Sequence, residues 1–458
     1  MHPVTSSLQT LSALQIGALI QAGAMSARDV AEATLAACEA CEDKAVFTRL
    51  TSERALAEAD LSDRRRREGR PLGPLDGVPV AWKDLFDLAG IVTTAGSRVL
   101  AGEPPAHTDA AVVARLQAAG MVTIGKTGMN EFAFSGIGIN PHYGTPHNPH
   151  GTDTPRIPGG SSSGSAVAVA RGLVPVAIGT DTGGSVRIPA AFNGIIGYKA
   201  TRGRYPMEGV FPLARSFDSL GPLCRCVADA IAIDAALRGL AAPTMTPRSL
   251  AGQKIIVPAN ILVAMDYEAQ VLAAFEGALT RLAAAGALIE WRALPALNVV
   301  LDIARRAGGL ATREAYFLHE KRLNGPEAAA MDHRVVFRMR HGAETDPAAE
   351  AALVARRAGL IRETREAIGA GTLVAFPTVL HVAPPIAPLE ADDNLFVATN
   401  GRTLRNTMLG NFLDWCGVSI PCGTGEANMP IGFLLSALGR EDTFLLAAAM
   451  AAEETIRG

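Results

Sequence analysis

Apolar residues recur at helical spacing through most of the first 61 residues. In the segment "SARDVAEATLAACEA" a serine precedes apolar positions three and four residues apart, which predicts a serine-capped amphipathic helix. The basic run "SDRRRREGR" and the glycines and prolines of "PLGPLDG" end this pattern. The pattern predicts a helical wrap over residues 1–69.

Farther along, short apolar runs alternate with helical segments. The run "VPVAW" predicts a buried strand that ends in Lys83 and Asp84. The segment "TDAAVVARLQAAGMVTIGKT" predicts a helix capped by Asp109, a stop at Gly120 and a strand. Residues 163–181 and 254–294 repeat the alternation of helix and strand, so we expect the α/β class. The expected fold is a large, mostly parallel or mixed central sheet with helices on both faces.

The second half of the chain predicts a helical region and then a return to the sheet. Residues 299–370 are mostly helical in pattern, with a helix start at Asp346 and Pro347, before "TLVAFPTVLHVAPPIAP" becomes strand and proline-rich loop. Residues 237–252 interrupt the pattern as either a linker or a surface loop. We predict one domain over 1–458, whose parts are the wrap at 1–69, a core at 70–236, a variable, largely helical insertion at 253–370 and a C-terminal return at 371–458.

Composition excludes several classes of function. Hydrophobic residues make up 48% of the chain and charged residues 19%, which is typical of a folded globular protein. The net charge of -3 provides no general positive field, so we expect no nucleic-acid ligand. The longest apolar run, "FLLAAAMAA", is too short to span a bilayer, and we expect no membrane association.

Cysteine usage favours a reduced, cytoplasmic setting. The six cysteines lack the density of a disulfide scaffold, and no histidines stand at zinc-ligand spacing, so we expect no metal site. Cys38 and Cys41 form a C-x-x-C, but they lie inside an alanine-rich helical run without a second pair. We interpret them as helix residues.

Two glycine–serine clusters flank one αβ step between residues 158 and 185, "PGGSSSGSAVAVARGLVPVAIGTDTGGS". In such a unit both clusters can reach the same edge of the sheet. The glycines allow the backbone amides of Thr182, Gly183, Gly184 and Ser185 to face outward, as an oxyanion hole requires. Ser185 is also suited to capping the helix that follows, and the loop alone favours capping over a nucleophile, so both interpretations remain open at this point.

A serine nucleophile needs a base, and none of the nine histidines lies in either cluster. The "GSSSG" at 160–164 matches a nucleophile elbow in letters, but a helix follows it and no apolar strand precedes it. Lysine is scarce, and Lys83 follows a buried strand, where desolvation could leave its amine neutral. The alternative, which this segment alone favours, is an ordinary strand-end lysine paired with Asp84 or another carboxylate.

The stretch from Gly159 to Pro189 resembles the amidase signature family, whose hallmark is a glycine–serine cluster, an αβ step and then G-T/S-D-x-G-G-S-I/V-R-x-P. The segment "GPLDGVPVAWKDLFDLAGIVTTAGS" resembles the lysine-bearing part of that family, and "GVSIPCG" with "MPIGFLLSALGREDTFLLAAA" resembles its closing strand and helix. The resemblance covers most of 70–235 and about 370–455. It implies the amidase signature fold and hydrolysis of amides without metal or organic cofactor.

The resemblance also implies site residues. The nucleophile falls on Ser185, the bridging serine, in a cis peptide after Gly160, on Ser161, and the lysine base on Lys83. The amides of residues 182–185 would stabilise the oxyanion, and an acyl-enzyme on Ser185 would follow. We expect structural support from five further groups of the motif: Ser162, Ser163, the ion pair of Asp181 with Arg187, Lys126 and Lys199.

Four residues fall where members of the family line the acyl pocket, and they suggest an apolar or aromatic substrate: Met129, Asn130, Phe132 and Tyr143. For Phe132, packing in the core is an equal alternative. We expect a stand-alone amidase acting on a small-molecule amide, as a monomer or homodimer.

Three other functions remain open. The same attack on a carbonyl serves carbamates and esters. The chain also resembles the glutaminase A-type subunit of a tRNA-dependent amidotransferase, but Ile188 stands where that subunit normally has glutamine, and Asn193 where cysteine is common. A non-catalytic binding protein would be expected to lack one of the three catalytic residue types, and all three are present.

Overall fold

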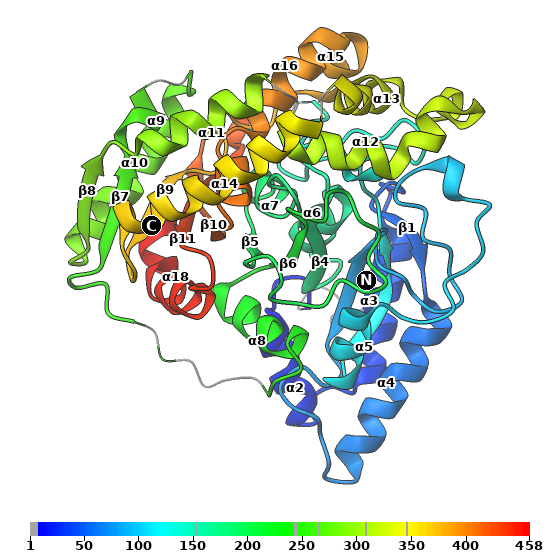
Figure 1. Cartoon of the computed structure of the whole chain (residues 1–458). Helices are drawn as coiled ribbons and strands as arrows, with labels where there is room; N and C mark the ends of the chain where they lie inside the picture. Colours follow the sequence, from blue (N-terminus) through cyan, green and yellow to red (C-terminus); the bar gives the residue numbers. More distant parts are fainter. Residues whose placement is uncertain are drawn as a thin grey trace.

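One mixed sheet of 11 strands runs through the molecule, in the order β1-β3-β2-β4-β6-β5-β10-β11-β9-β7-β8 (Figure 1). The computed structural model describes residues 8–151, 154–241, 246, 248–263, 266–306, 309–344 and 347–458. The strands are β1 Phe47–Leu50, β2 Pro79–Lys83, β3 Val122–Thr127, β4 Val176–Asp181, β5 Ile196–Lys199, β6 Ser219–Cys224, β7 Lys254–Pro258, β8 Leu288–Arg292, β9 Leu373–Pro377, β10 Cys416–Thr424 and β11 Pro430–Ala437.

Helices surround this sheet, as the α/β prediction required. They are α2 Ala13–Gln21, α3 Ala27–Ala40, α4 Ser52–Arg67, α5 Ala111–Ala118, α6 Ser163–Ala170, α7 Arg187–Phe192, α8 Val227–Leu237, α9 Ala259–Val263, α10 Ala269–Ala284, α11 Pro295–Arg306, α12 Gly309–Asn324, α13 His333–Arg340, α14 Pro347–Ile368, α15 Ile386–Ala391, α16 Asp393–Leu404, α17 Thr407–Phe412 and α18 Asp442–Arg457. Within the described ranges, no helix has both the length and the apolar character that a bilayer crossing demands.

The direction of strand pairing brings the serine and lysine segments together. Strand β2 pairs in parallel with β3 on one side and with β4 on the other, so all three strands end at the same edge. At the centre of the sheet, β4, β6, β5, β10, β11 and β9 pair antiparallel in turn, which makes the sheet mixed rather than mostly parallel. The carboxyl ends of parallel strands are where α/β proteins commonly form their sites.

Local capping follows the sequence at one helix and departs from it at another. Ser26 caps α3, and its hydroxyl accepts a hydrogen bond from the Asp29 amide at 2.9 Å. The predicted cap at Asp109 is wrong, because Ala110 holds the cap position of α5 without a side-chain bond. The Asp109 carboxylate instead accepts from Arg54 at 2.7 Å, so a tertiary ion pair takes the group that the local pattern assigned to capping.

The N-terminal wrap contains one strand that the helical pattern concealed. Strand β1 lies between α3 and α4 and forms the edge of the sheet against β3. The predicted helical region at 299–370 is present as α11–α14 and lies in the upper half of the view in Figure 1, below α15 and α16. The predicted helix start at Asp346 lies outside the described residues, and α14 is described from Pro347 onward.

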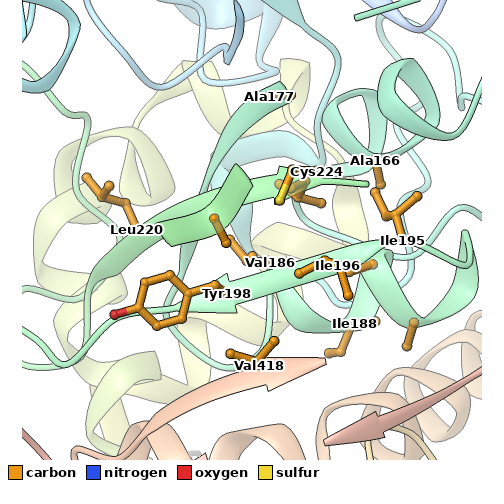
Figure 2. Packing of buried hydrophobic residues seen from close by; sticks show 14 of the residues in the cluster. Ala166, Ala177, Val186, Ile188, Ile195, Ile196, Tyr198, Leu220, Cys224 and Val418 are labelled. Atoms are coloured by element: carbon orange, nitrogen blue, oxygen red, sulfur yellow. The ribbon is translucent and has the colours of Figure 1, made fainter. Parts of the chain in front are cut away.

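The core fixes the position of α7, the helix that follows Ser185. Val186 and Ile188 are fully buried and lie beside Ile196 and Tyr198 of β5 (Figure 2). Burying such side chains stabilises a fold by about 1.5–3 kcal/mol each. The apolar anchors therefore hold the chain immediately after Ser185 in one place.

Candidate active site

Lys83 ends β2 and points its amine at two hydroxyl groups. Its Nζ donates to Ser161 Oγ at 2.7 Å and to Thr180 Oγ1 at 2.8 Å, and its side chain is fully buried. Thr180 belongs to β4, the parallel neighbour of β2, while Ser161 lies in the loop before α6. The strand pairing therefore unites the lysine with the glycine–serine cluster.

The surroundings of Lys83 favour a neutral amine. Burial lowers its pKa to about 7, although the charges of Asp181 and Asp218 act in the opposite direction. Asp181 is itself paired with Arg187 at 2.9 Å, and Asp218 accepts a hydrogen bond from Thr182 Oγ1 at 2.6 Å. A substantial fraction of Lys83 is therefore unprotonated at neutral pH.

The alternative in which Lys83 pairs with Asp84 is wrong. Asp84 faces Lys126 instead, with 2.6 Å between Oδ1 and Nζ, and both side chains are buried. Across the described residues, Lys83 makes no ion pair. Lys126 is occupied with this carboxylate, and Lys199 donates to the carbonyl oxygens of Ala200 and Trp415.

Ser161 follows a cis peptide bond with Gly160 and is fully buried. Gly160 passes so close to Asn130 that a Cβ atom would lie 2.1 Å from Asn130 Oδ1, which explains the glycine there. The next residue, Ser162, donates its amide to the carbonyl oxygen of Ser185 at 3.3 Å. This bond joins the first glycine–serine cluster directly to the second.

Ser185 does not cap α7. Val186 holds the cap position, and it is the Asp181 carboxylate that accepts from the Val186 and Arg187 amides, at 3.1 and 3.4 Å. The capping interpretation of Ser185 is therefore wrong. Ser185 instead lines a cavity of about 1150 Å³, together with Thr182 and Gly183. The serine is thus available to a molecule bound in that cavity.

The loop over residues 182–185 packs closely against Thr407. Gly184 has a φ of +136°, and a Cβ there would lie 2.1 Å from Thr407 Oγ1. The same Thr407 hydroxyl donates to the Gly183 carbonyl oxygen at 2.6 Å. None of the described residues accepts a hydrogen bond from the amides of 182–185. These amides remain available as donors, which an oxyanion hole requires.

A buried ion pair braces this loop, as the sequence predicted. Asp181 accepts from Arg187 Nε at 3.0 Å and from the Val186 amide at 3.1 Å. Burial raises the pKa of Asp181, but the charge and hydrogen bonds of Arg187 outweigh it and hold the pKa well below its usual range. Asn411 bonds to both partners, since it donates to Asp181 Oδ1 and accepts from Arg187 Nη2.

The two predicted support serines lie in the framework of the site. Ser162 Oγ donates to the Thr180 carbonyl oxygen at 3.4 Å, and Ser163 Oγ donates to the Gly128 carbonyl oxygen at 3.3 Å. Both side chains are fully buried. They connect the glycine–serine cluster to the ends of β4 and β3.

The four predicted pocket residues do not line the cavity. Met129, Asn130 and Phe132 are buried, and Tyr143 is partly buried. The Phe132 ring packs on His319, with 4.2 Å between ring centroids, so it serves the core. The positions that follow it line the cavity instead: Ala133, Phe134 and Ser135.

Sequence reasoning missed four polar groups around the site: Thr180, Asp218, Thr407 and Asn411. Thr180 lies in the same "GTDTGGS" motif, two residues before Thr182, and this position in the motif could have identified it as a site residue. The other three lie 33 or more residues from Ser185, and only the tertiary fold brings them to it. In the part of the chain that is described, no group of three or more His, Cys, Asp or Glu side chains could hold a metal ion.

Comparison with known proteins places this geometry in a family. The model of the family described as "Amidase" matches residues 29–446. The chain is 36% identical over 416 residues to the 2-amino-5-chloromuconic acid deaminase of Comamonas testosteroni, covering 88% of this chain and 87% of that protein. It is 33% identical to the A-type subunit of the glutamyl-tRNA(Gln) amidotransferase of Salinispora arenicola, covering 98% of each.

Solved structures agree with this assignment. A structure described as an amidase superposes with a TM-score of 0.86 at 31% identity, covering 97% of this chain and all of the other. The 6-aminohexanoate cyclic dimer hydrolase superposes with a TM-score of 0.84 at 26% identity, covering 98% of each chain. The chain therefore belongs to the amidase family, and it is a hydrolase that acts on carbon–nitrogen bonds.

Proposed function

We propose that the protein is a stand-alone amidase in which Ser185 attacks the amide carbonyl, with Ser161 and Lys83 moving the proton. The observation that carries this proposal is the fully buried Lys83 amine, which donates to the Ser161 hydroxyl at 2.7 Å and has a pKa of about 7. The Ser162–Ser185 backbone bond holds the two serine segments together. Ser185 itself faces the cavity.

The proton follows a two-step path in this mechanism. Neutral Lys83 accepts the Ser161 proton while Ser161 accepts the one leaving Ser185, whose oxygen forms a bond to the carbonyl carbon. The amides of residues 182–185 stabilise the oxyanion, and each such donor is worth about 3 kcal/mol. The protonated lysine returns a proton through Ser161 to the leaving amine, and water then cleaves the acyl-enzyme.

The roles of the loop residues follow from their contacts. Asp181 and Arg187 hold the turn that presents the amides, and Gly184 allows that turn to pass Thr407. The cavity walls are largely apolar, with Leu213, Phe217 and Leu310 among them, which suits an apolar small-molecule substrate.

The same site could serve carbamates or esters, because each presents a carbonyl to Ser185. The alternative of a glutaminase subunit is weaker because of the departures at Ile188 and Asn193. Asn193 supports the loop framework, since its Nδ2 donates to the Pro158 and Pro189 carbonyl oxygens. We further propose a cytoplasmic location, which the six free cysteines support. Monomer and homodimer remain the predicted states.

A fluorophosphonate probe followed by peptide mass spectrometry tests the proposal. We expect a single adduct on Ser185, and turnover of at least one of a panel of anilides, primary amides, carbamates and esters. Ser185→Ala should abolish both. The matched control is Ser165→Ala, a buried serine of α6 whose hydroxyl bonds to Thr127, and it should keep both. An adduct on any other serine would contradict the proposal.

A further inference from the structure

More arginines than carboxylates line the cavity beside Ser185, although one of the arginines, Arg402, contacts the Asp266 carboxylate at 3.7 Å. Three arginines line it, on α13 and at the end of α16: Arg338, Arg402 and Arg405. Glu344 provides the only carboxylate among the described lining residues, and it contacts His341 at 3.1 Å. A cavity with this balance attracts anions and disfavours cations.

Arg338 contacts Phe134 and forms no ion pair with any residue that the structure describes. Its Nη2 donates to the Phe134 carbonyl oxygen, and its guanidinium lies over the Phe134 ring at 4.7 Å from the centroid. Its Nη1 is buried without a hydrogen-bond partner among the described residues. Asp332, whose negative charge acts on Arg338, is engaged by Arg334 through two bonds of 3.0 Å. Arg338 therefore keeps donors that no described group uses.

An unsatisfied guanidinium inside a protein is costly, and structures normally pair it. Burial lowers the pKa of Arg338 to about 10, so it still carries its charge at neutral pH. The planar donor fork of arginine matches a carboxylate in geometry. Phe134 and Arg338 both line the cavity that Ser185 lines, so an anion held there shares the space of the reacting substrate.

On the basis of the proposed function, we propose that the substrate is an amide with an apolar body and a carboxylate, and that Arg338 binds this carboxylate. The apolar walls accept the body, and the arginine sets which end of the molecule faces away from Ser185. The carboxylate belongs to either the acyl part or the leaving amine. Substrates that carry the carboxylate on only one of these two parts distinguish the two sources.

Two matched substrate pairs test the proposal. For the acyl part, glutaryl 4-nitroanilide is compared with its neutral counterpart hexanoyl 4-nitroanilide. For the leaving part, hexanoyl 4-aminobenzoate is compared with hexanoyl anilide. We expect the charged member of at least one pair to have a kcat/KM about 10- to 100-fold higher, mainly through a lower KM. Equal values, or a preference for the neutral member, in both pairs would overturn the proposal.

Variants of α13 separate charge recognition from folding. Arg338→Met should remove the preference for the charged substrate and leave the neutral one within about threefold, while Arg338→Lys should restore part of it. The control is Arg340→Met, which removes an equal charge from the same helix but lies outside the cavity lining. An equal loss on both members of a pair would assign Arg338 a purely structural role and overturn the proposal.

Measuring the binding of these substrates to the Ser185→Ala variant tests charge recognition without turnover. Calorimetric titration with the same four compounds should show the charged member binding more tightly, and Arg338→Met in that background should remove the difference. If charged ligands bind preferentially but Ser185 supports no turnover, the proposed function fails and the carboxylate subsite stands. If turnover occurs without any charge preference in binding, the subsite fails and the proposed function stands.

Discussion

Two buried lysines at the ends of neighbouring strands show how partners, rather than burial, decide what a lysine does. In the parallel register of β2 and β3, Lys83 lies opposite Thr127, and Lys126 lies opposite Trp82. Lys126 faces the Asp84 carboxylate at 2.6 Å, whereas Lys83 faces two hydroxyls. A carboxylate stabilises the charged amine, and a hydroxyl pair in a buried site does not compensate for its lost hydration.

Substitution is expected to reduce stability at Lys126 and activity at Lys83. At Lys126 the ion pair belongs to the framework, because removing either partner leaves a buried charge. At Lys83 the fold keeps a titratable amine where a neutral apolar side chain would be more stable, which is typical of a site that serves chemistry. Variants at the two positions should therefore separate activity from stability.

The largest effect is expected from replacing the two lysines by methionine in turn. Lys83→Met should lower kcat/KM by about 10^4-fold, because no base remains for Ser161, and should leave the free energy of unfolding unchanged or higher. Lys126→Met should lower the free energy of unfolding by about 3–5 kcal/mol, because Asp84 stays buried without its partner. Turnover assays measure kcat/KM of each variant, and urea unfolding measures its free energy of unfolding. Equal loss of stability at the two sites would contradict the comparison.

The next largest effect comes from giving Lys83 a carboxylate of its own. Thr180→Asp places a negative charge where the Lys83 amine now meets a hydroxyl, so the pKa of Lys83 should rise and kcat/KM at pH 7 should fall by about 100- to 1000-fold. Raising the pH should recover part of the activity. Loss of activity that does not respond to pH would show that the variant disturbs the site in another way.

The pH dependence of the wild-type enzyme follows from the same amine. The folded-state pKa of Lys83 is lowered to about 7, and the mechanism needs the neutral form, so kcat/KM should rise with pH and level off above pH 7. Between pH 7 and pH 5 it should fall by about 50-fold, close to tenfold per pH unit at the acid end. A profile that is flat from pH 5 to pH 8 would exclude Lys83 as the titrating base.

The smallest effect is expected from removing one hydroxyl beside each lysine. Thr180→Val leaves Ser161 as the only described partner of Lys83 and should lower kcat/KM by about three- to tenfold. Thr93→Val removes a hydroxyl that accepts from Lys126 Nζ at 2.9 Å, and should leave kcat/KM unchanged at a cost of about 1 kcal/mol in stability. An equal loss of kcat/KM in both variants would show that the two surroundings are functionally alike.

The sequence predicted several strands correctly where the pattern is local, although it missed β1. The strand ending in Lys83 and the αβ step between the two serine clusters depend on apolar periodicity and glycine placement, which the chain itself displays. The choice between Asp84 and a hydroxyl as the partner of Lys83 was not predictable, because it depends on how β2 lies between β3 and β4.

The cavity was the least predictable part of the site. Its walls come from segments far apart in the sequence, such as Ser135, Leu310 and Arg338. The aromatic Phe132 is a reasonable pocket residue by its position, but packing against His319 directs its ring into the core. Such choices depend on tertiary packing, which single-sequence patterns do not record.

The most direct test of the account is the pKa of the Lys83 amine itself, measured by NMR titration of the protein with 13C at the ε-carbons of lysine. The chain has only six lysines, and Lys83→Met assigns the signal by its disappearance. The account predicts a pKa of about 7 for Lys83. A Lys83 amine that remains charged up to pH 10 would contradict it, because the proposed proton transfer would then lack its base.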